Sequence, residues 1–235
     1  MRGTEESNDL QVIAVGKSGY GKSTTLNTLI GLKVFQTDDN VGCTRRMQSA
    51  EFKLPITDET SYFSLADLPG LGENPQRDAE YRDLYEMAFN KAHVIVYFLR
   101  ADHRDYSVDL RLFDELFRYV DHKTKLIIAL NAIDKTPPLC RSTPFVLSAE
   151  QQANIETKIA DVSKLFSLPT NDVVPLSGLE DYNTDLLVNK LLEKLSPFVE
   201  LNGSSFFSKS GLLIDRFDTY GPEGPGQWLC PLQDI

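Results

Sequence analysis

One glycine-rich stretch near the N-terminus constrains the fold more than any other part of the sequence. Residues 16–24 read GKSGYGKST, which fits the phosphate-binding loop pattern G-x-x-x-x-G-K-[ST]. An apolar run at residues 10–15 precedes this loop and is typical of a buried parallel strand. Residues 23–32 follow with apolar side chains at helical spacing, and Gly31 is placed to end that helix. The sequence therefore predicts a strand, a phosphate-binding turn and a helix in succession.

This succession suits the chemistry of a nucleotide phosphate. Glycines let the backbone turn its N–H groups toward phosphate oxygens, and the helix N-terminus adds partial positive charge. We expect Lys22 to reach the β- and γ-phosphates and the Ser23 hydroxyl to bind Mg²⁺. Tyr20 replaces a residue that is usually small, and it could cover the nucleotide or contact a partner. The residues expected to contact the nucleotide in this loop are Gly16, Ser18, Gly19, Tyr20, Gly21, Lys22, Ser23 and Thr24.

Strands and helices alternate along most of the chain. Strands are predicted at residues 10–15, 47–54, 61–68, 94–99, 125–130 and 172–176. Helices are predicted at residues 23–32, 79–92, 108–120, 148–166 and 182–195, with loops at residues 33–46, 69–78 and 135–147. This alternation predicts an α/β P-loop nucleotide-binding fold, a three-layer sandwich around a mostly parallel six-stranded sheet. The hairpin at residues 47–68 would add one antiparallel edge strand to that sheet.

The chain of 235 residues divides into a flexible lead-in at residues 1–9, a nucleotide-binding domain at residues 10–196 and an extension at residues 197–235. For the extension the sequence predicts no helix or strand. The net charge of −10 argues against a broad basic face for nucleic acid or anionic lipid. The apolar runs are too short to span a bilayer, and the polar, acidic start resembles neither a signal nor a transit peptide. We therefore expect a cytoplasmic protein without a transmembrane segment, whose three scattered cysteines are reduced thiols.

Two further segments could contact the γ-phosphate end of a nucleotide. Asp67 and Gly70 belong to a D-L-P-G motif that ends a predicted strand. The Asp67 carboxylate could hold Mg²⁺ through a water molecule, and the Gly70 backbone N–H could meet a γ-phosphate oxygen. Thr44 lies in the loop after the first predicted helix, and its hydroxyl is a candidate second protein ligand for Mg²⁺. A loop threonine without a role is the alternative for Thr44.

A base-recognition motif, N-A-I-D, follows the buried strand predicted at residues 125–130. The Asp134 carboxylate could accept hydrogen bonds from the N1–H and 2-amino groups of guanine, which adenine lacks. Asn131 would brace the loop and contact the edge of the base. After the last predicted strand, Ser177 and Gly178 would supply a backbone N–H for guanine O6. An ordinary turn from strand to loop is the plainer interpretation of N-A-I-D.

Together these motifs, with G-C-T-R at residues 42–45 and D-L-P-G-L-G-E at residues 67–73, resemble the Era-like branch of the translation-factor-related GTPases. The resemblance covers about residues 10–196 and implies switch regions at residues 36–47 and 69–80. It implies that the chain hydrolyses GTP to GDP and phosphate with Mg²⁺ and acts as a nucleotide-dependent switch. The candidate catalytic residues are Lys22, Thr44, Arg45 and Gly70. Era itself carries an RNA-binding KH domain, for which this sequence has neither the length nor the basic charge.

The sequence departs from the family pattern at three positions. Ala132 replaces the lysine of N-K-x-D, whose stem packs over the base, and Lys135 is a candidate substitute. Leu71 stands where Ras-like proteins have the glutamine that orients the attacking water. Gly19 stands where potassium-stimulated relatives have asparagine. We therefore expect slow intrinsic hydrolysis that depends on another group, on a protein effector or on a GTP-dependent homodimer.

Several switch residues are candidates for that other group. Arg45 and Arg46 could act as arginine fingers in cis or across a dimer, or be solvated loop charges. In the second switch region, the candidates for this group are Glu73, Asn74 and Arg77, which could equally be solvated loop residues. Two further functions stay open: a GTP-binding regulatory module with negligible hydrolysis, which the leucine after D-L-P-G favours, and a P-loop ATPase, which the missing lysine of N-A-I-D allows.

Overall fold

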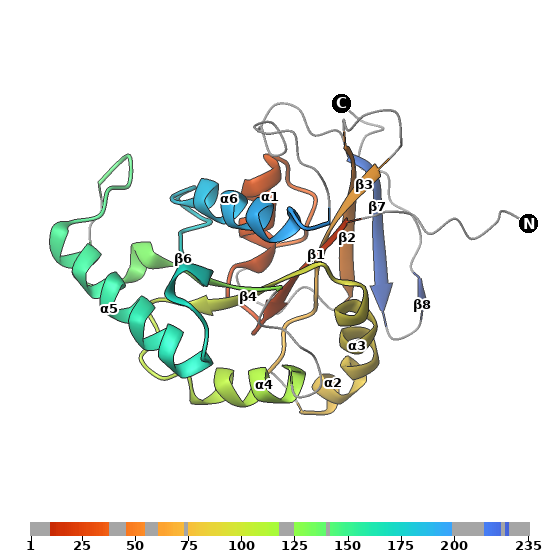
Figure 1. The fold of residues 1–235 in the computed structure, drawn as a ribbon, viewed down its shortest axis with the longest axis horizontal. Helices are drawn as coiled ribbons and strands as arrows, with labels where there is room; N and C mark the ends of the chain where they lie inside the picture. Colours follow the sequence, from red (N-terminus) through yellow and green to blue (C-terminus); the bar gives the residue numbers. More distant parts are fainter. Residues whose placement is uncertain are drawn as a thin grey trace, which may run out of the picture.

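The computed structural model describes residues 10–37, 46–54, 61–72, 75–117, 125–139, 142–198, 214–221 and 224–225. Its helices and strands are drawn in Figure 1. The strands are β1 (Leu10–Gly16), β2 (Met47–Leu54), β3 (Ser61–Asp67), β4 (Val94–Arg100), β5 (Leu126–Asn131), β6 (Val173–Pro175), β7 (Ile214–Gly221) and β8 (Gly224–Pro225). The helices are α1 (Lys22–Ile30), α2 (Pro75–Glu80), α3 (Arg82–Lys91), α4 (Ser107–Phe117), α5 (Ala149–Phe166) and α6 (Thr184–Leu195), with short 3₁₀ helices η1 (Ile133–Lys135) and η2 (Thr170–Asp172).

The strands form one sheet in the order β6-β5-β4-β1-β3-β2-β7-β8. Neighbouring strands from β6 to β3 are parallel, and β2 runs antiparallel to β3. The predicted six-stranded, mostly parallel sheet with one antiparallel strand is thus confirmed in the part from β6 to β2, but β2 is not at the edge of the sheet. Beyond β2 the sheet continues with β7 and β8 from the C-terminal extension, where the sequence predicted no strand. The segment Ile214–Gly221 mixes apolar and charged residues without strict alternation, so its pairing with β2 decides its conformation.

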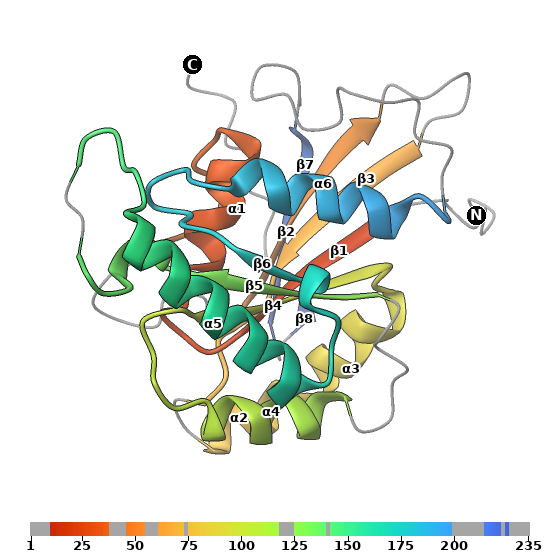
Figure 2. The ribbon, with the colours of Figure 1, turned by 60° about the vertical axis from the view of Figure 1, so that its left-hand side comes forward.

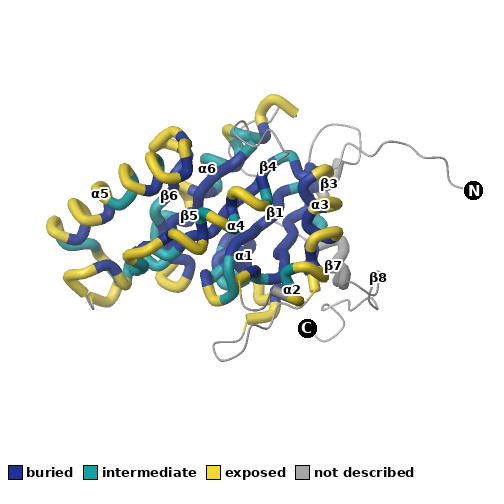
Figure 3. Tube along the Cα trace, turned by 90° about the horizontal axis from the view of Figure 1, so that it is seen from below, coloured by how far each residue is buried: buried dark blue, intermediate teal, exposed yellow. Residues whose placement is uncertain are grey.

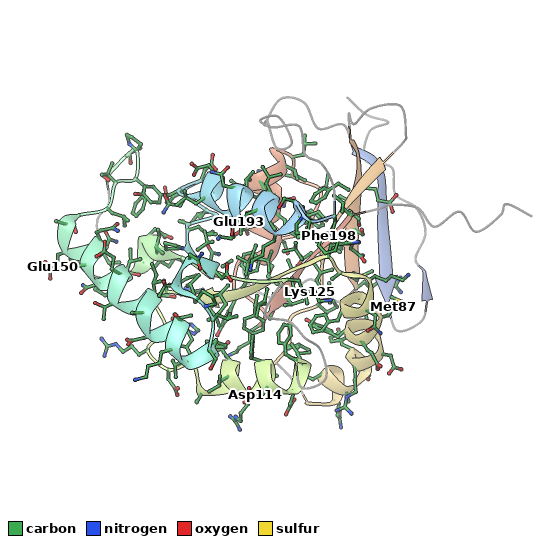
Figure 4. All side chains as sticks on the ribbon, viewed as in Figure 1. Met87, Asp114, Lys125, Glu150, Glu193 and Phe198 are labelled. Atoms are coloured by element: carbon green, nitrogen blue, oxygen red, sulfur yellow. The ribbon has the colours of Figure 1, made fainter. Side chains whose placement is uncertain are left out.

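Helices cover both faces of the sheet. Helices α1 and α6 lie together over one face, and α3, α4 and α5 lie over the other (Figures 1 and 2). Strands β1, β4 and β5 are buried along almost their whole length (Figure 3). Their uninterrupted apolar sequences are what a parallel strand needs when both of its faces are covered. Asp114 of α4 and Glu150 of α5 are exposed on the outer sides of their helices (Figure 4).

An aromatic cluster holds α4 under the centre of the sheet. The Phe113 ring of α4 lies 5.4 Å from the Tyr97 ring of β4 and 5.0 Å from the Phe166 ring of α5, measured between centroids. The Phe117 ring stacks on Phe89 of α3 at 5.1 Å. Such aromatic pairs add to the free energy gained by burying their area. The cluster fixes α4, and with it the polar residues at its N-terminal end, close to the phosphate loop.

The predicted element boundaries are confirmed at two helix ends. Gly31 ends α1 in the left-handed conformation, with φ of 71°. Ser148 begins α5 through a capping box, because its hydroxyl accepts the Gln151 N–H and the Gln151 side chain accepts the Ser148 N–H. The loop predicted at residues 69–78 is wrong in its last part, because α2 begins at Pro75. The fixed φ of proline suits the first position of a helix. Among the described residues, no helix is both long and apolar enough to cross a membrane.

Candidate functional site

The phosphate loop connects β1 to α1 and packs against the loop that follows β5. Gly21 has φ of 81°, and a Cβ atom there would lie 2.3 Å from Asn131 Nδ2. Both its backbone conformation and this close approach therefore require glycine. Gly19 is exposed at the tip of the loop, whereas Gly16 is buried at the end of β1. Thus the loop is held against the body of the protein at one end and is accessible at the other.

Lys22 folds back over the phosphate loop. Its side chain is 5% exposed, and its Nζ donates hydrogen bonds to the carbonyl oxygens of Gly16 and Lys17, both at 3.2 Å. These carbonyls hold the ammonium group on the loop, with Ser18 half-buried beside them and Thr24 half-buried in the first turn of α1. The arrangement holds a buried positive charge on the phosphate loop.

Ser23 and Asp67 are in direct contact, since the Ser23 hydroxyl donates a hydrogen bond to Asp67 Oδ2. The contact follows from the sheet, in which β3 is parallel to β1 and Asp67 is in register with Ala14 just before the phosphate loop. Asp67 is fully buried. A hydroxyl and a carboxylate oxygen side by side are the hard donors that Mg²⁺ prefers, so this pair fits the metal. No cluster of three or more His, Cys, Asp or Glu side chains in the described part of the chain could hold a metal by itself.

The loop after β3 lies directly on the phosphate loop. A Cβ atom at Gly70 would lie 2.5 Å from the Cα and N atoms of Ser18, so the two backbones approach more closely than any other residue would permit. The next residue, Leu71, donates its N–H to the Gly16 carbonyl at 3.4 Å. The Leu71 side chain is 5% exposed and belongs to the hydrophobic core. It cannot orient a water molecule.

Asn131 connects three loops. Its Nδ2 donates to the Tyr20 carbonyl at 2.9 Å, and its Oδ1 accepts the Gly178 N–H at 3.0 Å. The bracing role expected of Asn131 thus has a structural basis. Ser177 and Gly178 were expected to supply a backbone N–H for guanine O6, and in this structure the Gly178 N–H is directed at Asn131. Ser177 is buried and exchanges two backbone hydrogen bonds with Tyr182, which fixes the turn.

Asp134 lies in the short η1 helix just after β5 and is half-buried. Ala132 precedes this helix with φ of 61°, an unusual value for a residue other than glycine. That conformation turns the chain sharply between Asn131, whose side chain braces the loop, and Asp134. Lys135, the candidate substitute for the missing lysine, is exposed.

The Tyr20 side chain points into the protein. Its side chain is 4% exposed, and its hydroxyl donates to Asp109 Oδ2 at 3.2 Å and lies 3.2 Å from His103 Nδ1. Lys17 Nζ lies 3.9 Å from the same Asp109 oxygen. Burial, followed by the charge of Asp109, raises the pKa of the Tyr20 hydroxyl well above its ordinary value, and burial also raises the pKa of the Asp109 carboxyl. Both uses that the sequence suggested for Tyr20 are therefore wrong, and its polar partners anchor the phosphate loop to α4.

Several predicted site residues lie outside the described part of the chain. They include Thr44 and Arg45 in the first switch region and Glu73 and Asn74 in the second. Arg46 is described and exposed, and only the backbone of Arg77 is described, within α2. The role of Thr44 as a magnesium ligand and that of Arg45 or Arg46 as an arginine finger therefore stay predictions.

Phosphate, D-x-x-G and N-x-x-D loops at the ends of β1, β3 and β5 define the class of P-loop nucleotide-binding proteins. The model of the 50S ribosome-binding GTPase family matches residues 11–132, and the chain belongs to this family.

Asp109 and His103 follow β4 without any motif of their own, and their contact with Tyr20 could not be recognised from the sequence.

The chain is similar to the Escherichia coli (strain K12) protein YkfA, with 29% identity over 197 residues that cover 82% of this chain and 66% of YkfA. It is 27% identical to GTPase Era of Aquifex aeolicus over 187 residues, covering 78% of this chain and 56% of Era. The crystal structure of a point variant of Aquifex aeolicus Era bound to GDP.AlF4- matches with a TM-score of 0.63 at 24% identity, covering 87% of this chain and 61% of that one. The chain thus spans between 56% and 66% of the length of these relatives, and it shares the Era-like fold.

Proposed function

We propose that this chain is a Mg²⁺-dependent GTPase that acts as a nucleotide-dependent switch. The observation that supports the proposal is the hydrogen bond between Ser23 and Asp67, two side chains whose oxygen atoms are the kind of donor that Mg²⁺ prefers. GTP binding and hydrolysis are general properties of the family to which the chain belongs. A γ-phosphate would draw the loops around Thr44 and Gly70 together, and its loss would release them.

Each site residue then has a defined task. Lys22 neutralises charge on the β- and γ-phosphates, and the Gly70 N–H donates to a γ-phosphate oxygen. Ser23, Thr44 and Asp67 would hold Mg²⁺, which when bound supplies positive charge to the phosphate oxygens. Asp134 accepts hydrogen bonds from the guanine edge, and Asn131 holds its loop against the phosphate loop.

Intrinsic hydrolysis should be slow. The side chain after D-L-P-G is the buried Leu71, so that position offers no group for the attacking water. We propose that a second copy of the chain or a protein effector supplies the missing group, with Arg45 or Arg46 as the candidate finger. A GTP-binding regulatory module with negligible hydrolysis is the second candidate function, and the burial of Leu71 is the observation that favours it.

Nucleotide affinity and phosphate release on the purified protein test these proposals. We expect submillimolar binding of GTP and GDP, weaker binding of ATP, and slow GTP turnover that disappears when Mg²⁺ is chelated. Lys22→Ala should abolish tight binding of GTP while the protein stays folded, and the exposed Lys33 offers a matched control as Lys33→Ala. Micromolar GTP binding by a folded Lys22→Ala variant would contradict the site assignment.

Turnover per molecule across protein concentrations separates the two candidate functions. A rate per molecule that rises with concentration supports a second copy as the source of the missing group. Arg45→Ala and Arg46→Ala should lower that rate without changing GDP affinity if either side chain acts only in the transition state. Undetectable phosphate release at every concentration, with tight GTP binding, would favour the regulatory module.

A further inference from the structure

Arg100 is the last residue of β4, and its position brings it close to two separate nucleotide-binding loops. In the sheet, β4 lies between β1 and β5. Phe98 is in register with Gly16, where the phosphate loop begins, and Arg100 is in register with Asn131, where N-A-I-D begins. The end of β4 therefore reaches both loops, although Arg100 belongs to neither motif.

Three hydrogen bonds fix the plane of the Arg100 guanidinium. Its Nε donates to Asp102 Oδ1 at 2.9 Å and its Nη2 donates to Asp102 Oδ2 at 2.7 Å. Its Nη1 donates to the carbonyl oxygen of Gly19 in the phosphate loop at 3.4 Å. The two bonds to one carboxylate form a planar fork, which orients the guanidinium before any ligand arrives. About a quarter of the side chain stays exposed, 24% of its area, so one part of the group can meet a ligand.

The charges around Arg100 link it to the base-recognition loop as well. Hydrogen bonds to Asp102 raise the pKa of Arg100 above its ordinary value against the opposing effect of burial, and the negative charge of Asp134 contributes to the rise. Asp134 is the carboxylate expected to read guanine. Arg100 is thus in contact with the loop for the phosphates and within electrostatic reach of the residue for the base.

Ala132 lacks the long side chain that the family has at this position. The family lysine at this position would lay an apolar stem over the base, which the methyl group of alanine cannot do. A nucleotide with phosphates at the phosphate loop and its base edge at Asp134 would pass its ribose and purine beside Arg100. A planar, weakly hydrated guanidinium stacks well on an aromatic face.

We propose that Arg100 replaces the missing lysine, covering one face of a purine nucleotide while it holds the Gly19 carbonyl. Asp102 is then a positioning residue that sets the plane of the guanidinium. The inference rests on the proposed guanine-nucleotide site and adds to it a binding residue that comes from a different strand. Lys135, which the sequence suggested for this task, is not needed.

The test compares GDP and GTP affinities of Arg100→Ala and Arg100→Met with the parent protein. Methionine keeps an apolar stem of similar length but removes the planar charge. A loss of affinity in Arg100→Met therefore does not come from lost packing of the stem. Both variants should bind GDP and GTP about 5- to 30-fold more weakly, as expected for a desolvated guanidinium–aromatic contact. Arg104→Ala, which removes an exposed cation close to Arg100 in the sequence, should bind as the parent does.

A rescue variant separates nucleotide contact from a structural role. Adding Ala132→Lys to Arg100→Ala should restore most of the affinity, because lysine can adopt the backbone that alanine already adopts at residue 132 and would supply the stem and charge from the family position. Unchanged affinity in both Arg100 variants would overturn the proposal. So would a loss of affinity that falls together with the melting temperature and that Ala132→Lys does not restore. A parent that binds no guanine nucleotide would instead overturn the proposed function.

Discussion

The side-chain amide of Asn131 donates a hydrogen bond to the Tyr20 carbonyl over 2.9 Å, and thereby joins two loops that are 111 residues apart in the chain. The same side chain accepts the Gly178 N–H, so one buried amide holds together the phosphate loop and both loops expected around the base. The phosphate and base subsites are therefore mechanically coupled through this residue.

Asn131→Ala should lower the free energy of unfolding by about 1–3 kcal/mol, because it leaves a buried carbonyl and a buried N–H without their partner. GDP affinity should fall more than this loss of stability alone would cause, since both subsites lose their alignment. Urea unfolding and GDP titration measure the two effects. Asn154→Ala is the matched control, because Asn154 also donates to a backbone carbonyl, that of Pro137, but is exposed on α5. An Asn131→Ala variant with parental GDP affinity would show that the loops do not depend on this bridge.

Gly70→Ala should weaken GTP binding more than GDP binding. The added Cβ would meet the Ser18 backbone at 2.5 Å, and neither backbone can move aside without separating the two loops. Separation removes the Gly70 N–H from the γ-phosphate, which GDP lacks. Competition of GTP and GDP against a labelled nucleotide gives the ratio, with GDP as the internal control. Equal affinities of parent and variant for GTP would place the γ-phosphate elsewhere.

Asp134→Asn should change which base the protein prefers. A carboxylate only accepts hydrogen bonds, and guanine offers two adjacent donors, so the variant loses a charge-assisted pair worth roughly 1–3 kcal/mol. The amide of asparagine adds a donor, which suits xanthine with its carbonyl in place of the amino group. Relative affinity for xanthosine triphosphate should therefore rise. Competition among GTP, ATP and xanthosine triphosphate measures the ranking, and an unchanged ranking would mean that Asp134 does not read the base.

Stability should fall as the pH drops below the ordinary pKa of histidine, and His93 should contribute to the fall. Burial, followed by the charge of Lys125, lowers the pKa of His93, and its Nδ1 accepts the Gln11 N–H at 3.1 Å (Lys125 and Phe198, which packs on the His93 ring, are labelled in Figure 4). The unfolded chain therefore binds a proton at higher pH than the folded chain does. Between about 6.5 and the lowered folded value, each step down in pH favours unfolding.

His93→Asn isolates this contribution, because the asparagine Oδ1 can accept the Gln11 N–H but does not titrate. Urea unfolding at pH 7.5 and pH 5.5 should show a smaller loss of stability in the variant than in the parent, by at most about 1.4 kcal/mol per pH unit. The comparison cancels the other titrating groups, which both proteins share. Identical losses in the two proteins would show that His93 stays accessible to protons in the folded state.

The sequence by itself determined the parts of this protein whose signals are local. The spacing of glycines, Lys22 and Ser23 specified the phosphate loop, because a turn and a helix start depend on residues next to each other in the chain. Uninterrupted apolar runs predicted β4 and β5, since a strand covered on both faces needs no polar side. Ser148, a residue type that favours the position just before a helix, indicated the start of α5 for the same local reason.

Only the tertiary structure decided where side chains with distant partners point. Tyr20 turns inward because Asp109 and His103, more than eighty residues away, offer buried polar partners for its hydroxyl. Arg100 meets Gly19 because β4 lies beside β1 in the sheet, an adjacency that no spacing along the chain records. The strand β7 exists in its register because β2 presents a row of backbone donors and acceptors to it. Burial and hydrogen bonding across the sheet set these contacts, and their free energy depends on which segments meet in space rather than on their neighbours in sequence.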